Sequence, residues 1–355
     1  MHVNGARDTS VPWDESSPVM PLGGPGSEVF RAPARAGDRY VAVRLWCGAS
    51  RDEVDLALER IARVSRVSHP NLASVEACEV RGNAALWIVS EYVPGPTLEA
   101  WARGGGRMPL SAAIELMRNV SLGVHAGVRE GISHHAIHPG NLVLWRQGTS
   151  GLKLDAKLLD LSLASWMQPG VPSLDEAHFM APETLAMVLD GYETSDQIDA
   201  RANVYSCGAL LYYLATGALP YRSPGLVELA TAHAEGKLWA PRGHNPEISE
   251  SLQTVILGAL AIRPSGRYAN PSELASALAA VQWRDGLNLE PRSKSVPPPL
   301  PSRRFTSEQS SSSSRPMNYA DEVTERTTLT PAERSEQSRR SRLTAWSSIL
   351  AVFDN

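Results

Sequence analysis

The sequence has 355 residues, of which 43% are hydrophobic, and a formal net charge of −4. That content suffices for one sizeable core, and a nearly neutral chain gives no electrostatic reason for nucleic-acid binding. Its three cysteines are widely spaced, with no C-x-x-C pair or Cys/His cluster. This argues against a disulfide framework and a structural zinc site, and it favours a reducing, cytoplasmic setting.

The N-terminal residues 1–18 are polar and turn-rich, which predicts a flexible N-terminus without the basic start and apolar run of a signal peptide. Residues 50–67 place apolar side chains at helical spacing, with Ser50 and Asp52 available as caps. Four segments of apolar and β-branched character predict strands, at residues 28–32, 40–46, 72–80 and 84–93.

The pattern becomes mainly helical after residue 97, interrupted by a loop-rich block at residues 132–194. The helical patterns lie at residues 98–104, 111–131, 200–217, 225–236, 251–262 and 271–283. This order predicts an α+β fold of two lobes. The N-lobe, residues 19–93, is a small antiparallel sheet with one helix, and the C-lobe, residues 97–284, is larger and mainly helical. The cleft between them is the expected ligand site.

Residues 285–342 are rich in proline, serine and charge, and they predict a disordered linker. The chain continues with a short apolar segment at residues 343–355. No segment approaches the roughly 18 to 20 apolar residues that span a bilayer, so no transmembrane segment is expected. The final segment is either a weakly packed terminus or a docking element for a partner.

Several motifs follow one another in a recognisable order over residues 21–283. "FMAPET" contains Ala181, Pro182 and Glu183, and "IRPSGRY" contains Arg267. Together with the motifs described below, they resemble the eukaryotic-type Ser/Thr protein kinase family, in the form common among bacterial kinases. The resemblance implies a bilobal kinase fold in which Arg267 pairs with Glu183. It also implies a long central helix, in which Asn203 stands for the family's aspartate.

The part of the sequence that resembles the nucleotide site is altered. The glycine loop of the family is represented by "LGGPGSEV", in which one of three glycines is in register. Arg44 stands where the family has a lysine, and Arg60 stands at the position of its glutamate partner, with Glu59 one residue earlier. The positions that the resemblance assigns to nucleotide binding are Gly24, Gly26, Val29, Ala42, Arg44, Glu91, Val93 and Leu144.

The segment "HHAIHPGN", residues 134–141, resembles the family's catalytic loop H-R-D-L-K-P-E-N. Ala136 replaces the aspartate that orients the substrate hydroxyl and accepts its proton, and a methyl group can do neither. His138 replaces the lysine that steadies the transferred phosphoryl group. Alignment on A-P-E also puts Glu176 at the position of a threonine that contacts this aspartate and lysine.

Two positions that hold metal in kinases are retained. Asn141 closes the loop, and Asp160 in "KLLDLSLA" stands at the aspartate of D-F-G. A carboxylate and an amide are adequate for Mg²⁺ that also binds nucleotide phosphates. The alternative is structural: Asp160 caps a turn and Asn141 binds the loop backbone.

Three hypotheses follow. The first is a pseudokinase, a regulatory or scaffolding module for protein partners in signalling, with little or no phosphotransfer and with ATP and Mg²⁺ as the ligands that the retained residues allow. The second is an active, unorthodox Ser/Thr kinase in which His135 or His138 is the base. The third is an interaction module that binds no nucleotide.

Overall fold

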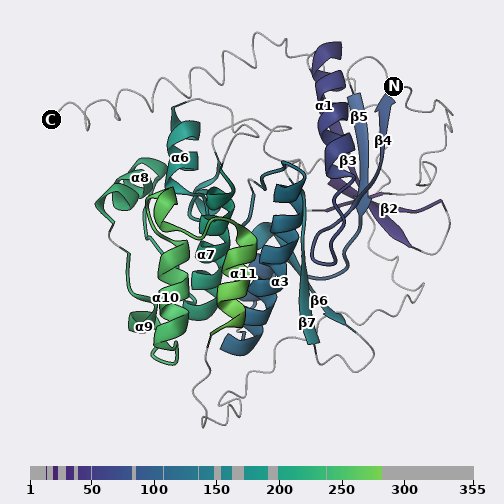
Figure 1. Ribbon diagram of the computed structural model, residues 1–355. Coiled ribbons are helices and arrows are strands. Elements are labelled where there is room, and N and C mark those ends of the chain that lie inside the picture. The colour runs from purple at the N-terminus through teal and green to yellow at the C-terminus, as the bar shows by residue number, and fades with distance from the viewer. Residues whose placement is uncertain are drawn as a thin grey trace. The chain divides into compact units, whose positions relative to one another are not determined.

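The structure is a computed structural model (Figure 1). It describes residues 13, 19–22, 29–35, 39–48, 50–81, 85–106, 108–134, 136–147, 153–161, 172–190, 199–236 and 238–281. Gly24, Gly26, the linker and the C-terminal apolar segment lie outside these residues. The chain divides into two compact units. The first contains the described residues up to Ser68 and Ala73–Tyr92, and the second contains His69–Leu72 and the described residues from Val93 onward.

The first unit is built on a five-stranded antiparallel sheet with strand order β1-β2-β3-β5-β4. The strands are β1 (Met20–Pro21), β2 (Val29–Pro33), β3 (Tyr40–Cys47), β4 (Val75–Arg81) and β5 (Ala85–Glu91). The four predicted strands are confirmed. The two-residue strand β1, which pairs with β2 at the sheet edge, is too short to leave a periodic signal in the sequence.

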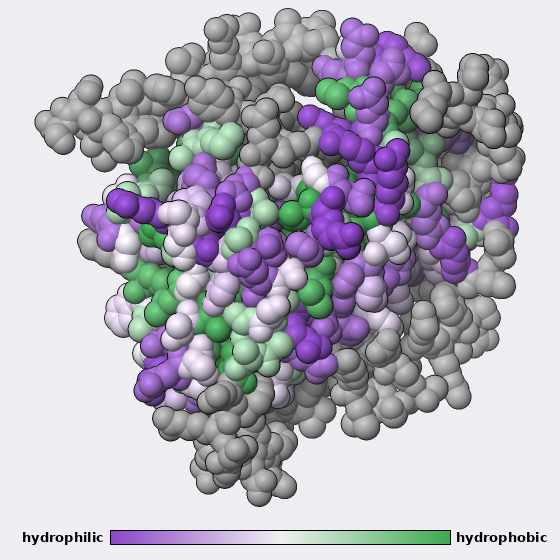
Figure 2. All heavy atoms as spheres, in the orientation of Figure 1, coloured by the Kyte–Doolittle hydropathy of each residue, from purple (hydrophilic) through white to green (hydrophobic). Residues whose placement is uncertain are grey.

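One helix, α1 (Arg51–Val64), belongs to this unit. Ser50 is its N-cap and accepts a hydrogen bond from the backbone N–H of Glu53, while Asp52 lies in the first turn, where an acidic side chain suits the helix dipole. The opposite face is charged, and the side of α1 seen in Figure 2 is mainly hydrophilic. The residues that α1 buries are Val54, Ala57, Ile61 and Val64.

Trp13 packs against this sheet, although the sequence predicts a flexible N-terminus at this position. Its side chain is 3% exposed and stacks on Trp87 with a centroid distance of 5.0 Å. It forms an isolated bridge with Ala34 and belongs to the apolar cluster around Val43 and Val89. The polar sequence around Trp13 does not predict this contact, because its aromatic partner, Trp87, lies far along the chain in β5.

The second unit is mainly helical, as predicted. Its helices are α2 (Leu98–Arg103), α3 (Leu110–Arg129), α5 (Leu174–Ala177), α6 (Pro182–Leu189), α7 (Ala200–Thr216), α8 (Leu226–Glu235), α9 (Pro241–His244), α10 (Glu250–Ala259) and α11 (Pro271–Ala279). The central helix α7 packs against α3, α10 and α11. Gly208 permits the close approach of α10, since a Cβ atom there would lie 2.6 Å from the Cβ of Ala259.

A two-stranded antiparallel hairpin, β6 (Leu142–Gln147) and β7 (Lys153–Leu158), lies within the block that the sequence predicted to be loop-rich. Each strand has six residues, and the two form a sheet of their own. The turn η1 (Pro139–Asn141) leads directly into β6, so the hairpin fixes the end of the loop at residues 134–141. Among the described helices, none is long and apolar enough to cross a bilayer.

We predict that Trp13→Ala destabilises the protein by about 2 to 4 kcal/mol, because it empties an aromatic position in the apolar face of the sheet. Urea unfolding followed by circular dichroism measures this. Trp239→Ala is the control, since Trp239 is 71% exposed, and its loss is expected to change stability by less than about 1 kcal/mol. Equal effects of the two substitutions would contradict the contact.

Candidate functional site

His134 anchors the loop at residues 134–141 in the second unit. The side chain is 1% exposed, and its Nε2 lies 2.9 Å from the carbonyl oxygen of Leu159. Its Nδ1 accepts a hydrogen bond from the backbone N–H of Ala136 at 3.2 Å. Because Nδ1 is the acceptor, Nε2 carries the hydrogen and donates it to Leu159. His134 therefore has a structural role in shaping the loop.

Asn141 closes the same loop from its other end. Its Nδ2 donates to the carbonyl oxygen of Ala136 at 3.1 Å, and its own carbonyl accepts from the N–H of Leu159 at 2.8 Å. Asn141 therefore binds the loop backbone, which is the structural alternative that the sequence offers for this residue. The bond to Ala136 also orients the side-chain amide and leaves its Oδ1, the atom that ligates a hard cation, out of that interaction.

Asp160 follows β7 with a φ of +56°, and it is the one non-glycine residue in the described part of the chain with positive φ. This left-handed conformation is unfavourable for most side chains and is best tolerated by Asn and Asp. The next residue, Leu161, is 4% exposed and packs beside Gly127, where a Cβ atom would lie 3.1 Å from it. Packing of Leu161 thus helps to hold the unusual backbone of Asp160.

The two expected metal ligands lie at the same end of the β6–β7 hairpin. Leu142 pairs with Leu158, and the residues just beyond this pair are joined by the hydrogen bond between Asn141 and Leu159. Within the described residues, no group of three or more His, Cys, Asp and Glu side chains could hold a metal. One carboxylate and one amide oxygen fit Mg²⁺ that takes its other ligands from water and phosphates, rather than a site made of protein alone.

His138 lies near the carboxylate of Glu176. Its Nε2 lies 3.9 Å from Oε1 of Glu176, and its Nδ1 accepts the backbone N–H of Gly140 at 3.2 Å. Burial lowers the pKa of His138 below its ordinary value, while the carboxylates of Glu176, Glu99 and Asp160 act in the opposite direction. The imidazole is consequently neutral at pH 7.

Three of the expected nucleotide-binding residues share one face of the first unit's sheet. Val29 pairs directly with Arg44, and Ala42 lies two residues from Arg44 along β3. Glu91 pairs with Val41 and so lies on the other face, and its N–H donates to the carbonyl of Ser74, just before β4. The side chain of Glu91 therefore does not join the other three.

The register of α1 bears on the partner of Arg44. Glu59 is exposed and lies on the side of α1 opposite to the buried stripe, whereas Arg60 is half-buried beside that stripe. This orientation disfavours the one-residue shift that would pair Glu59 with Arg44.

The remaining candidates belong to the second unit. Val93 is 9% exposed, and Leu144, on β6, is fully buried. The N–H of Leu144 donates to the carbonyl of Pro96 at 2.9 Å, which ties the segment after Val93 to the hairpin.

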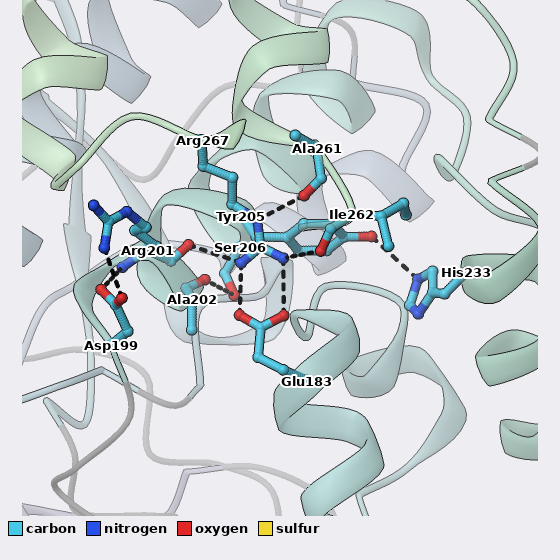
Figure 3. Close-up of polar contacts among 10 residues, drawn as sticks. All are labelled: Glu183, Asp199, Arg201, Ala202, Tyr205, Ser206, His233, Ala261, Ile262 and Arg267. Atoms are coloured by element: carbon cyan, nitrogen blue, oxygen red, sulfur yellow. Dashed lines mark hydrogen bonds and ion pairs between the residues drawn. The ribbon is translucent and has the colours of Figure 1, made fainter. Parts of the chain in front are cut away.

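The predicted pair of Arg267 and Glu183 is confirmed (Figure 3). The Arg267 side chain has no exposed surface, and its two Nη atoms lie 2.6 and 2.8 Å from the Glu183 oxygens. All five of its hydrogen-bonding contacts are formed, because the guanidinium also donates to the carbonyls of Arg201, Ala261 and Ile262. An unpaired guanidinium at this depth would be strongly destabilising.

A buried tyrosine and histidine lie beside this pair and were not anticipated from the sequence. The Arg267 guanidinium lies 5.0 Å from the ring centre of Tyr205, whose hydroxyl is 3.1 Å from Nε2 of His233. Burial lowers the pKa of His233 to about 4, with His178 and Arg267 adding to the effect. His233 is therefore neutral at pH 7. Tyrosine and histidine on separate helices carry no motif that reveals such a contact.

Asn203, at the position of the family's aspartate, is 2% exposed on α7. It lines a cavity of about 10 Å³ together with His134, Thr184 and Ser206 among others. The side-chain Nδ2 has no hydrogen-bond partner within the described residues. The amide at this position therefore leaves one buried donor without a partner among these residues.

An antiparallel-sheet unit with one helix, a helical unit, and a buried arginine paired to the glutamate of A-P-E together define a protein-kinase-like chain. The family model of the protein kinase domain matches residues 21–283. The chain belongs to this family.

Similar proteins include bacterial Ser/Thr kinases. A probable serine/threonine-protein kinase of Clostridium perfringens is 24% identical over 275 residues, covering 75% of this chain and 38% of that protein. A probable serine/threonine-protein kinase of Streptomyces coelicolor is 29% identical over 273 residues (73% and 38%). The serine/threonine-protein kinase PknB of Mycobacterium tuberculosis is 28% identical over 280 residues (75% and 42%). The matches thus span less than half the length of these relatives.

A solved structure, Rad53 residues 1–466 in complex with AMP-PNP, matches with a TM-score of 0.57 at 20% identity, over 73% of this chain and 63% of that one. At this identity the match supports the fold alone.

We predict that Arg267→Lys destabilises the protein by about 3 to 5 kcal/mol, because a lysine has three donors and cannot replace the planar, five-donor contact. Guanidinium unfolding measures the change. The matched control is Arg242→Ala, whose partner Glu250 is largely exposed, and it is expected to cost no more than about 1 kcal/mol. A small effect of Arg267→Lys would contradict the role assigned to the pair.

Proposed function

We propose that the chain is a pseudokinase, a protein-kinase fold that acts by binding partners and has little or no phosphotransfer activity. The observation that carries this proposal is Ala136. The loop around it forms its internal hydrogen bonds. The N–H of Ala136 donates to Nδ1 of His134, and its carbonyl accepts from Nδ2 of Asn141. Transfer to a hydroxyl uses a carboxylate at this place, and a methyl group supplies neither orientation nor a proton acceptor.

Mg·ATP is the ligand that we propose for this pseudokinase. Asn141 and Asp160 would hold the metal, which would neutralise phosphate charge. Support comes from their position at one end of the hairpin and from the orientation of the Asn141 amide. The residues proposed to contact the nucleotide are Gly24, Gly26, Val29, Ala42, Arg44, Glu91, Val93 and Leu144. Protein partners in signalling and a cytoplasmic location belong to the same proposal.

A second candidate is an active Ser/Thr kinase. It is favoured by the retention of both proposed metal ligands and by relatives that are named Ser/Thr protein kinases. Phosphoryl transfer through a loose transition state depends mainly on positioning and electrostatics, so loss of the aspartate slows the reaction without forbidding it.

Nucleotide binding is tested by thermal unfolding of the full chain with and without millimolar Mg·ATP. A ligand at about 100 times its Kd adds about 2.7 kcal/mol, so we expect the Tm to rise by several degrees. Asp160→Asn is expected to abolish the rise. Asp190→Asn, which removes an exposed carboxylate at the end of α6, is the control and is expected to keep it. No shift in the wild type would favour an interaction module that binds no nucleotide.

Phosphotransfer is tested with labelled ATP on the wild type beside Asp160→Ala. We expect incorporation into the chain and into a generic protein substrate to be the same in both, at background, because the loop lacks its carboxylate. Incorporation by the wild type that disappears in Asp160→Ala would overturn the pseudokinase proposal and establish the second candidate.

A further inference from the structure

Of three positions that depart from the kinase pattern, one lies next to both of the others. His138, Gly140 and Glu176 stand where the family has lysine, glutamate and threonine. His138 and Gly140 belong to the loop, and Glu176 belongs to α5, 36 residues further along by residue number from Gly140. Their contacts suggest that the three changes are not separate losses.

The hydrogen-bonding state of His138 follows from its neighbours. The side chain is the N-cap of η1, with Nδ1 accepting the N–H of Gly140. A neutral imidazole with Nδ1 as acceptor carries its hydrogen on Nε2. That nitrogen lies 3.9 Å from Oε1 of Glu176; the His138 side chain is 15% exposed and the Glu176 side chain 46%.

Glu176 is itself held in place by a capping box. Its Oε2 accepts from the N–H and from the hydroxyl of Ser173, both at 2.9 Å, while Ser173 accepts the N–H of Glu176. This occupies one carboxylate oxygen and leaves Oε1 as the one nearest His138. The capping box therefore fixes the position of the Glu176 carboxylate relative to α5.

Gly140 provides the space that His138 occupies. A Cβ atom at residue 140 would lie 3.0 and 3.1 Å from Cε1 and Nδ1 of the imidazole, and 3.4 Å from Oε2 of Glu99. A larger residue, such as the family's glutamate, would push the ring out of this place. The histidine and the glycine are therefore compatible as a pair.

We propose that His138, Gly140 and Glu176 form one interdependent set, in which His138 is a positioning residue that directs its Nε2–H toward Glu176 on α5. The negative charges of Glu99 and Asp160 also act electrostatically on the ring. Because Nε2 carries hydrogen and the Nδ1 lone pair accepts the N–H of Gly140, His138 has no free lone pair with which to take a proton from a substrate hydroxyl. The inference holds whether or not Mg·ATP binds, and it removes one base from the active-kinase candidate.

The test is long-range ¹H–¹⁵N correlation NMR on the full chain with ¹⁵N-labelled histidine, the His138 signals being assigned by their loss in His138→Gln. We expect the Nε2–H tautomer in the wild type at neutral pH. In Glu176→Gln we expect the pKa of His138 to fall, because the carboxylate that favours the charged ring is gone. Asp175→Asn removes an exposed carboxylate from the same helical turn and is expected to leave this pKa unchanged.

A second variant tests the set from the loop side and does not depend on the stability of α5. Gly140→Ala is expected to displace the ring and alter the tautomer ratio and pKa of His138. Gly243→Ala, at a glycine with open space around it, is the control and is expected to change neither. An Nδ1–H tautomer in the wild type, equal pKa changes in Glu176→Gln and Asp175→Asn, or no effect of Gly140→Ala would each overturn the proposal.

Discussion

The buried guanidinium of Arg267 is the interaction on which the arrangement of the helical unit depends. Its five N–H groups donate to the Glu183 carboxylate on α6, to the Arg201 carbonyl on α7, and to two carbonyls in the segment after α10. The Arg267 side chain has no exposed surface, and all of these acceptors lie 2.6 to 3.1 Å from the same planar group. These contacts fix the start of α6. The segment just before α6 contains Glu176, whose Oε1 lies 3.9 Å from Nε2 of His138 in the loop.

The loop combines retained shape with altered chemistry. His134 and Asn141 tie its two ends to Leu159 through hydrogen bonds that need no aspartate at residue 136. A loop can therefore keep its path after its base is lost, because backbone groups carry the path and a side chain carries the reaction. The replacements at residues 138, 140 and 176 are sterically and electrostatically compatible with one another. A comparison of one position at a time would treat them as three unrelated losses.

Prediction from the sequence succeeded where a signal was local or where a motif implied a pairing. Apolar and β-branched character revealed four strands of the five-stranded sheet, Ser50 was visible as a cap, and A-P-E with Arg267 implied the buried pair. The prediction of a loop-rich block did not name the strands Leu142–Gln147 and Lys153–Leu158, which form a sheet of two strands and owe their conformation largely to each other. The candidate metal ligands could be named, but not their common position at one end of that hairpin.

The sequence by itself determined the α+β class, the order of elements, the family resemblance and the absence of a carboxylate at residue 136, since all of these are properties of residue type and spacing. Only the tertiary structure decided that Trp13 packs against the sheet, that Glu59 lies opposite the buried stripe of α1, and that Nε2 of His138 lies 3.9 Å from Glu176. These contacts join residues far apart in the chain. Their existence depends on side-chain direction and packing, which no local pattern encodes.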